Sequence, residues 1–129
     1  RSPHSERILL LGQRSDVPEL LAAADVVACA SWREGAAGAL LEAMASATPV
    51  VAVSTVGLEG VLVDGVNARV VPRGSLAEGL LDVLRDAQTA SRLAVGGRLT
   101  ARHRFSSDRS VERMVEIYAT VAASRRHVG

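Results

Sequence analysis

The segment at residues 31–53, SWREGAAGALLEAMASATPVVAV, constrains the fold of this chain more than any other. A helix beginning near Gly35 or Ala36 would leave Glu34 in the preceding loop and place Glu42 about two turns inside, at ~3.6 residues per turn. Because Glu42 is then the only charged side chain of the helix, its apolar neighbours predict that the helix is buried. A buried carboxylate is unfavourable unless a partner binds it, so Glu42 is a candidate ligand-binding residue.

The same segment is suited to binding an anion. An apolar run at residues 26–30 enters a glycine-containing loop and then the start of the helix. Backbone N–H groups and the helix macrodipole favour phosphate at such a position. On chemistry alone an alternative stays open, in which Glu34 is a solvated loop residue beside Arg33 and Glu42 caps a backbone donor.

The order of these residues resembles the signature of family-4 retaining glycosyltransferases of the GT-B fold. The usual form of that signature is close to S-x-x-EG-x-x-x-x-LLEAMA-x-G-x-PVVA. The resemblance extends over nearly the whole chain. The matching positions of the signature are Ser31, Glu34, Gly35, Leu40, Leu41, Glu42, Ala43, Met44, Ala45, Pro49, Val50, Val51 and Ala52.

The resemblance implies roles for the two glutamates. Glu42 would bind the ribose hydroxyls of a nucleotide-sugar, and Glu34 would bind a hydroxyl of the donor sugar and be the candidate catalytic residue. The backbone N–H groups at the start of the helix would face the sugar and the diphosphate. The donor-sugar and diphosphate set is then Glu34, Gly35, Ala36, Ala37 and Gly38.

A second matching stretch, LLLGQRSDVPELLAAADVV at residues 9–27, precedes the signature. In the family this stretch begins with a strand, and the loop after that strand lies near the base of the nucleotide. Gln13 and Arg14 are therefore candidate nucleotide-binding residues together with Glu42. The alternative for Arg14 is an ordinary solvated loop arginine.

Several positions depart from the family pattern. The family usually has Gly-Gly-x-x-Glu after the PVVA strand, whereas Val56 occupies the first glycine position here and Gly60 the glutamate position. Such departures leave open a non-catalytic domain of the same fold that binds a nucleotide-sugar or a partner. A nucleotide-sugar epimerase of this fold is a further alternative, although no separate catalytic set is visible. The departing residues are Ala36, Ala37, Ala47, Val56, Gly60 and Ala68.

The alternation of short apolar runs with helical segments predicts an α/β fold, a Rossmann-like parallel sheet with helices on both faces. The predicted strands are residues 8–11, 26–30, 49–53 and 69–71. The predicted helices begin at Asp16, at the signature, at Ser75 and near Gln88, and a last one begins at Ser106 or Ser107. A capping box of Ser75 and Glu78 is expected.

The predicted helices carry further expectations about burial. Leu76, Leu80, Leu81 and Leu84 are expected on the inner face of the helix that begins at Ser75. Gly96-Gly97 should interrupt the following helix. One face of the last helix should pack, with Val111, Met114, Val115, Tyr118, Val121 and Ala122 recurring at intervals of three and four.

Composition excludes several other classes of protein. The chain has 129 residues and a net charge of +1, which supports one domain and gives no reason to expect nucleic-acid binding. Its single cysteine, Cys29, lies in a strand-like run and is interpreted as a core residue. The three histidines show no metal-ligand spacing, so neither a metal nor another cofactor is expected. Without a signal peptide or a long apolar run, a cytoplasmic location is expected.

Residues 1–129 are therefore interpreted as a single partial domain, the C-terminal part of a GT-B donor domain that ends in helices. The resemblance implies that two strands and an N-terminal acceptor-binding domain of the same protein are missing. The expected ligand is a nucleoside-diphosphate-sugar, and the full-length protein could associate peripherally with a membrane. The expected function is the donor-binding portion of a retaining glycosyltransferase that moves a sugar to an acceptor hydroxyl.

Overall fold

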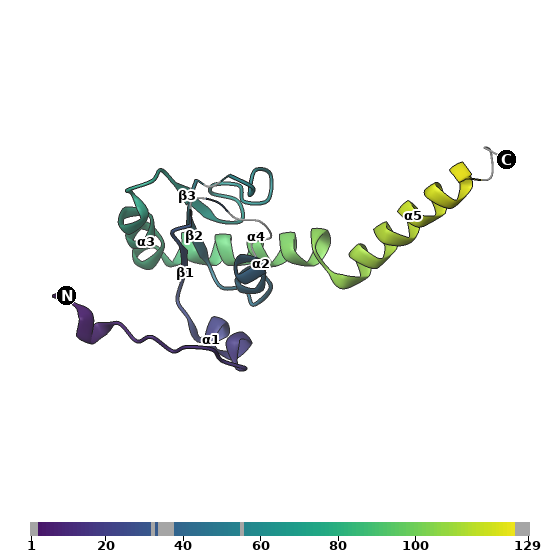
Figure 1. The fold of residues 1–129 in the computed structure, drawn as a ribbon. Helices are drawn as coiled ribbons and strands as arrows, with labels where there is room; N and C mark the ends of the chain where they lie inside the picture. Colours follow the sequence, from purple (N-terminus) through teal and green to yellow (C-terminus); the bar gives the residue numbers. More distant parts are fainter. Residues whose placement is uncertain (1–2, 32, 34–37, 55, 126–129) are drawn as a thin grey trace.

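The computed structural model describes residues 3–31, 33, 38–54 and 56–125. A short 3₁₀ turn, η1, at Ser5–Arg7 is followed by alternating helices and strands and then by three successive helices (Figure 1). The strands are β1 (Val27–Cys29), β2 (Val50–Val53) and β3 (Arg69–Val71). The helices are α1 (Val17–Ala23), α2 (Gly38–Ala45), α3 (Leu76–Arg85), α4 (Ala87–Arg104) and α5 (Ser107–Arg125).

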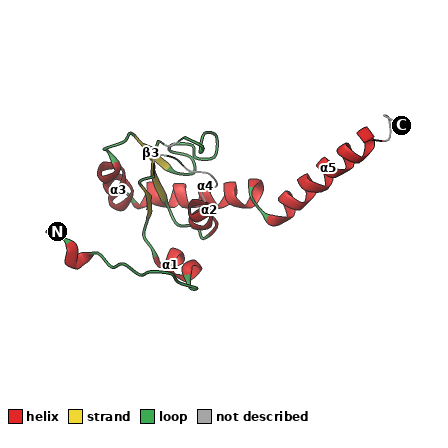
Figure 2. Ribbon diagram, in the orientation of Figure 1, coloured by secondary structure: helices red, strands yellow, loops and turns green. Residues whose placement is uncertain are grey.

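The strands form a three-stranded parallel sheet in the order β1-β2-β3 (Figure 2). Val27 pairs with Val50, and Val51 pairs with Arg69. All four residues of β2 are buried, as expected for the central strand of a parallel sheet that is covered on both faces. The predicted α/β class is confirmed, and the predicted strands at residues 26–30, 49–53 and 69–71 form.

The two faces of the sheet pack against different helices. On one face, Val50 and Ala52 join a core cluster with Met44 of α2 and Ala101 from the end of α4. On the other face, Val51 packs with residues of α3 and the first half of α4. Helix α4 therefore contributes to both clusters, and α2 and α4 are in extensive contact.

Helix α4 approaches the chain between β2 and β3 very closely. A Cβ atom at Gly96 would lie 2.0 Å from the carbonyl oxygen of Val66, and one at Gly97 would lie 3.3 Å from that of Asn67. The helix runs without a break through both glycines, so the predicted interruption is wrong. Glycine is present because backbone, rather than a side chain, occupies the adjoining space.

The predicted strand at residues 8–11 does not form. Leu9 and Leu10 are 79% and 94% exposed, and no strand of the described residues pairs with this segment. A strand is stable only when a neighbour satisfies its backbone groups, and here β1 pairs with β2 alone. The apolar run therefore lies extended on the surface.

Helix α3 also departs from expectation in two details. Ser75 occupies the N-cap position but makes no side-chain capping bond, so the predicted capping box is absent. Leu81 and Leu84 are 44% and 54% exposed, so their predicted place on the inner face is wrong. Leu76 and Leu80 pack against the core as predicted, beside the buried Gly79 and Val83. The small Gly79 lets α3 approach the sheet, where a Cβ atom would meet the side chain of Val71 at 2.8 Å.

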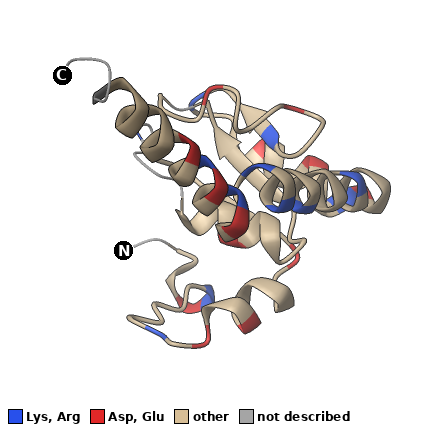
Figure 3. Cartoon of the chain, turned by 90° about the vertical axis from the view of Figure 1, so that its right-hand side faces the viewer, with Lys and Arg blue, Asp and Glu red and all other residues tan. Residues whose placement is uncertain are grey.

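Helix α5 extends away from the sheet, and the residues of its apolar face are exposed (Figure 1). The prediction that this face is buried is wrong for the part of the chain that the structure describes. The charged residues along α5 alternate in sign (Figure 3), with ion pairs Arg109–Glu112 and Arg113–Glu116. The exposed apolar residues include Val111, Met114, Val115, Tyr118 and Val121.

The end of α2 shows why the family signature has glycine at the position of Ala47. Ala47 has a φ of 58°, in the left-handed region, at the position where the signature has glycine. Its N–H donates to the carbonyl of Met44, and that of Thr48 donates to Ala43, each at 3.0 Å. These bonds close the helix and require the left-handed residue, which glycine adopts more readily than alanine.

We expect Ala47→Gly to raise the free energy of unfolding by about 0.5–1 kcal/mol, because the left-handed penalty of ~1–2 kcal/mol outweighs the extra unfolded-state freedom of glycine. The control, Ala45→Gly, changes a helical residue and should lower the free energy of unfolding by about 1 kcal/mol. Apparent melting temperatures would measure both. A lower melting temperature for Ala47→Gly would contradict this account.

Candidate functional site

The loops that follow β1 and β2 leave the same edge of the sheet, because parallel strands have their carboxyl ends together. A parallel bridge between Arg33 and Val56 extends the contact beyond the ends of both strands. The two loops therefore run side by side. In open α/β sheets this edge is where ligands bind.

Most of the predicted sugar and diphosphate residues lie in the loop after β1. Glu34, Gly35, Ala36 and Ala37 fall outside the described residues, and only Gly38 of that set is described. Gly38 is exposed at the start of α2, and a Cβ atom there would meet nothing within 4 Å. A side chain at Gly38 would therefore meet no other described residue outside its own helix.

The loop after β2 is held by its own carboxylate. The N–H of Gly57 donates to Oε2 of Glu59 at 2.7 Å. Backbone N–H groups of Glu59 itself and of Gly57 hold the pKa of the Glu59 carboxyl below its ordinary value. Gly60 has a φ of 74°, a conformation that disfavours the glutamate found there in the family.

A cavity of about 300 Å³ lies against this loop. Its volume is at the lower end of the range for small-molecule sites, about 300–1,000 Å³. Apolar residues dominate its walls, and Glu59 and Ser54 supply polar groups. The lining residues are Val53, Ser54, Val56, Leu58, Glu59, Leu62 and Val70.

Glu42 is exposed, so the expectation that it lies on a buried helix is wrong. Helix α2 buries only one side, through Leu40, Ala43 and Met44, and Glu42 projects from the other side. Its carboxylate is therefore accessible without a large desolvation cost. Glu42 lines a cavity of about 450 Å³ together with Leu41, Ala45, Ala101, Arg102, Phe105, Ser106 and Ser107.

Gln13 and Arg14 lie in an exposed loop before α1. The guanidinium of Arg14 donates to both carboxylate oxygens of Asp16, at 2.7 and 2.5 Å, and these bonds lower the pKa of Asp16. Asp16 consequently makes no capping bond to α1. Helix α1 packs on α2, but no described hydrogen bond or ion pair joins Gln13 or Arg14 to Glu42.

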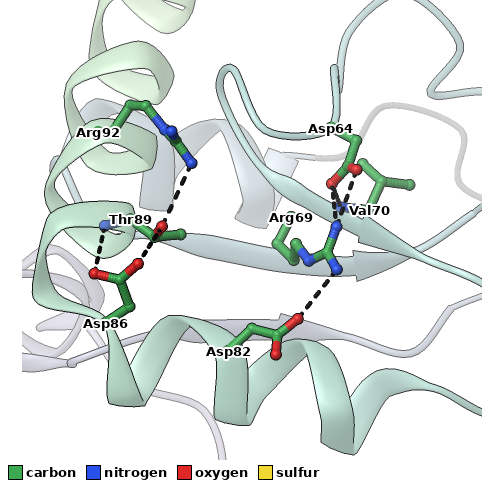
Figure 4. A network of polar contacts seen from close by, with 7 residues as sticks. All are labelled: Asp64, Arg69, Val70, Asp82, Asp86, Thr89 and Arg92. Carbon is green, nitrogen blue, oxygen red and sulfur yellow. Dashed lines mark hydrogen bonds and ion pairs between the residues drawn. The ribbon is translucent and has the colours of Figure 1, made fainter.

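A second polar cluster lies at the outer edge of β3 (Figure 4). Arg69 pairs with Asp64 and Asp82, each at 3.0 Å, and so connects β3 to the preceding turn and to α3. The N–H of Val70 also donates to Asp64, at 2.8 Å. The charges in this cluster satisfy one another, and the sequence offered no motif for it. Its role is to hold β3 in place.

Asp86 has a similar structural role at the start of α4. Its carboxylate accepts bonds from the N–H group and the hydroxyl of Thr89 (Figure 4). It also accepts a bond from the N–H group of Gln88. The bonds from Thr89 and Gln88, with the charge of Arg92, lower the pKa of Asp86. Asp86 is therefore an N-cap.

The described part of the chain has neither a metal-binding cluster nor a membrane-spanning helix. Its acidic, histidine and cysteine side chains form no group of three or more that could hold a metal ion. Within the same residues, every helix is too short or too polar to cross a membrane. Cys29 is a buried residue at the end of β1, in agreement with its predicted place in the core.

Comparison with known proteins places these features in a family. The family model described as "Glycosyl transferases group 1" matches residues 1–86. The chain belongs to this family. The resemblance seen in the sequence is therefore confirmed.

Relatives and solved structures agree with this membership. D-inositol 3-phosphate glycosyltransferase of Salinispora tropica is 38% identical over an alignment of 119 residues that covers 86% of this chain and 23% of the relative. The crystal structure of Anabaena Alr3699/HepE in complex with UDP has a TM-score of 0.84 and 29% identity, covering 90% of this chain and 33% of that one. The C-terminal domain of LpcC, a glycosyl transferase group 1 family protein from Francisella tularensis, has a TM-score of 0.67 and 27% identity, covering 78% and 53% respectively.

The chain thus spans only about a quarter to a third of these full-length proteins, at 23% and 33% of their lengths. Its fold is that of a GT-B glycosyltransferase domain. The assignments of Glu34, Gly38, Glu42, Gln13 and Arg14 to parts of a ligand stay predictions.

Proposed function

We propose that this chain is the donor-binding portion of a retaining glycosyltransferase that moves a sugar from a nucleoside diphosphate to an acceptor hydroxyl. The observation that carries the proposal is the Arg33–Val56 bridge, which brings the signature loop beside the loop after β2. The structural match to Alr3699/HepE, crystallised with UDP and with UDP-glucose, supports the same ligand class.

In this proposal the carboxyl edge of the sheet receives the donor. Glu34 contacts the donor sugar as the candidate catalytic residue, and the backbone at residues 35–38 faces the sugar and diphosphate. Glu42 binds the ribose hydroxyls, and Gln13 and Arg14 lie near the base. The exposure of Glu42 supports this role, because an accessible carboxylate can accept two hydroxyl donors.

Transfer would be accelerated mainly by positioning the two sugars and by stabilising charge on the departing diphosphate. We propose that no metal ion or other cofactor is needed for this. The acceptor would bind to an N-terminal domain of the same protein, and residues 1–129 would be a partial donor domain. A cytoplasmic location, with peripheral association at a membrane, belongs to the same proposal.

A second candidate function is a non-catalytic domain that binds a nucleotide-sugar or a partner. The specific observation in its favour is the loop after β2, where Val56 replaces glycine and is 63% exposed. Calorimetric titration of the full-length protein with UDP-, GDP- and ADP-sugars, followed by a transfer assay, separates the two. Binding with sugar transfer favours the enzyme, and binding without transfer favours the second candidate.

The first test changes Glu42. If its carboxylate accepts hydrogen bonds from a ribose, Glu42→Gln in the full-length protein should weaken nucleotide-sugar binding by about 1–3 kcal/mol. The fold should be unaffected because Glu42 is exposed. Calorimetry would measure the change, and Glu78→Gln, on the exposed surface of α3, is the matched control. Unchanged affinity in a folded Glu42→Gln protein would return Glu42 to a structural role.

The second test adds a side chain at the start of α2. Gly38→Val adds a side chain where a diphosphate would lie, so affinity for a nucleoside diphosphate should fall more than affinity for its nucleoside. Ala77→Val on α3 controls for the helix cost of a β-branched residue. Equal losses for both ligands would argue against phosphate contact at Gly38.

The third test concerns the partial domain. Residues 1–129 expressed alone should aggregate and transfer no sugar, because residues 8–11 are exposed and β1 leaves an unpaired edge. Light scattering and a transfer assay would measure this, and restoring upstream residues of the protein should rescue both. A monomer of 129 residues that melts cooperatively and transfers sugar would refute the partial-domain proposal.

A further inference from the structure

The last residue of α4 reaches the loop that follows β2. Nη1 of Arg104 donates a hydrogen bond to the carbonyl oxygen of Gly60 at 2.6 Å. The two residues are 44 positions apart in the sequence. This bond therefore connects the carboxyl end of a long helix to the ligand edge of the sheet.

The chain between β2 and β3 has two halves, and the second half, residues 61–67, is held by a buried side chain. Asn67 is only 3% exposed, and its Oδ1 accepts from the N–H of Val63 at 2.7 Å. Its Nδ2 donates to the carbonyl of Val61 at 2.8 Å and to the hydroxyl of Thr100 on α4 at 3.0 Å. Residues 61–67 are thus fixed on α4 by a buried amide.

The first half of the chain between β2 and β3, residues 54–60, is held by different contacts. It contains Gly60 in a left-handed conformation and is exposed over most of its described residues. Its start is attached to the sheet, because the N–H of Ser54 donates to the carbonyl of Val71 and Val56 forms the bridge with Arg33. The bond from Gly57 to Glu59 lies within the turn, and Leu58 is buried in the core. At the end of this half, Arg104 adds a hydrogen bond from α4 to the exposed Gly60.

Arg104 is well placed for this task. Its guanidinium lies over the ring of Phe105, 5.4 Å from the ring centre, which restricts the orientation of the side chain. The residue also lines a groove of about 580 Å³ at the junction of α4 and α5, with Arg109, Arg113 and Met114. The guanidinium therefore connects this junction to the loop after β2.

We propose that Arg104 is a positioning residue of the donor site, where its bond to Gly60 holds the loop after β2 beside the signature loop, whose backbone faces the donor diphosphate in the proposed function. The inference rests on the proposed function, which puts the donor at this edge of the sheet. A loop held in its bound conformation loses less entropy when the ligand arrives, so the tether favours binding. Arg104 itself does not touch the sugar.

The test uses three variants of the full-length protein. Arg104→Met removes the N–H groups that donate the hydrogen bond to Gly60 but keeps an apolar side chain over Phe105. Arg104→Lys keeps one group that can donate this hydrogen bond. Arg98→Met is the control, since Arg98 is exposed on the same helix and its side chain takes part in no hydrogen bond or ion pair with the described residues. Unchanged melting temperatures would establish that all three proteins are folded.

The first measurement is binding of UDP, GDP and ADP and of their nucleosides by calorimetry. Arg104→Met should weaken the preferred diphosphate about fivefold, the equivalent of one hydrogen bond, and leave its nucleoside unchanged. Arg104→Lys should recover most of the loss, and Arg98→Met should match the wild type. Equal weakening of diphosphate and nucleoside, or none, would overturn the role of Arg104.

The second measurement needs no ligand. Hydrogen exchange at residues 54–62 should be faster in Arg104→Met and return towards the wild-type rate in Arg104→Lys. Unchanged exchange would refute the tether whether or not a nucleotide binds. If exchange changes as expected but the wild type binds none of the three nucleoside diphosphates, the tether holds and the proposed function fails, and with it the role of Arg104 in a donor site.

Discussion

Helix α4 packs directly on the chain segment that connects β2 to β3. The packing of both core clusters depends on this contact. Gly96 and Gly97 carry no side chain, so the helix can lie directly on the backbone of Val66 and Asn67. The buried amide of Asn67 also bonds to the backbone of Val61 and Val63 and to Thr100 of α4, so its own polar atoms are satisfied at this contact. Helix α4 can consequently complete core clusters on both faces of a small sheet.

This arrangement decides which groups face the ligand edge. Strand β2 is buried on both sides, so polar chemistry is possible only in the loops at its ends. The bridge from Arg33 to Val56 aligns two of these loops, and α4 holds the second of them through Asn67 and Arg104. The carboxylate of Glu42 lies on the open side of α2, where solvation lowers the cost of keeping it charged.

Membership of the glycosyl transferases group 1 family agrees with the apolar surfaces that are exposed in the described part of this chain. The chain corresponds to 23% of one relative and 33% of a structurally similar protein. The apolar face of α5 and the segment at residues 8–11 are surfaces that a globular protein would ordinarily cover. In our proposal, other parts of the same protein provide the cover and complete the site.

The sequence by itself determined the class of fold, three of the four predicted strands and the family, because local apolar patterns and a specific signature are enough for these. It placed Asp16 and Ser75 at helix starts but could not tell how their side chains would bond. Only the tertiary structure decided that Glu42 is exposed, that Gly96 and Gly97 lie inside a continuous helix, and that Arg104 meets Gly60. Each depends on groups brought together from distant positions, since a side chain is buried, kept small or hydrogen-bonded according to neighbours that a local pattern does not contain.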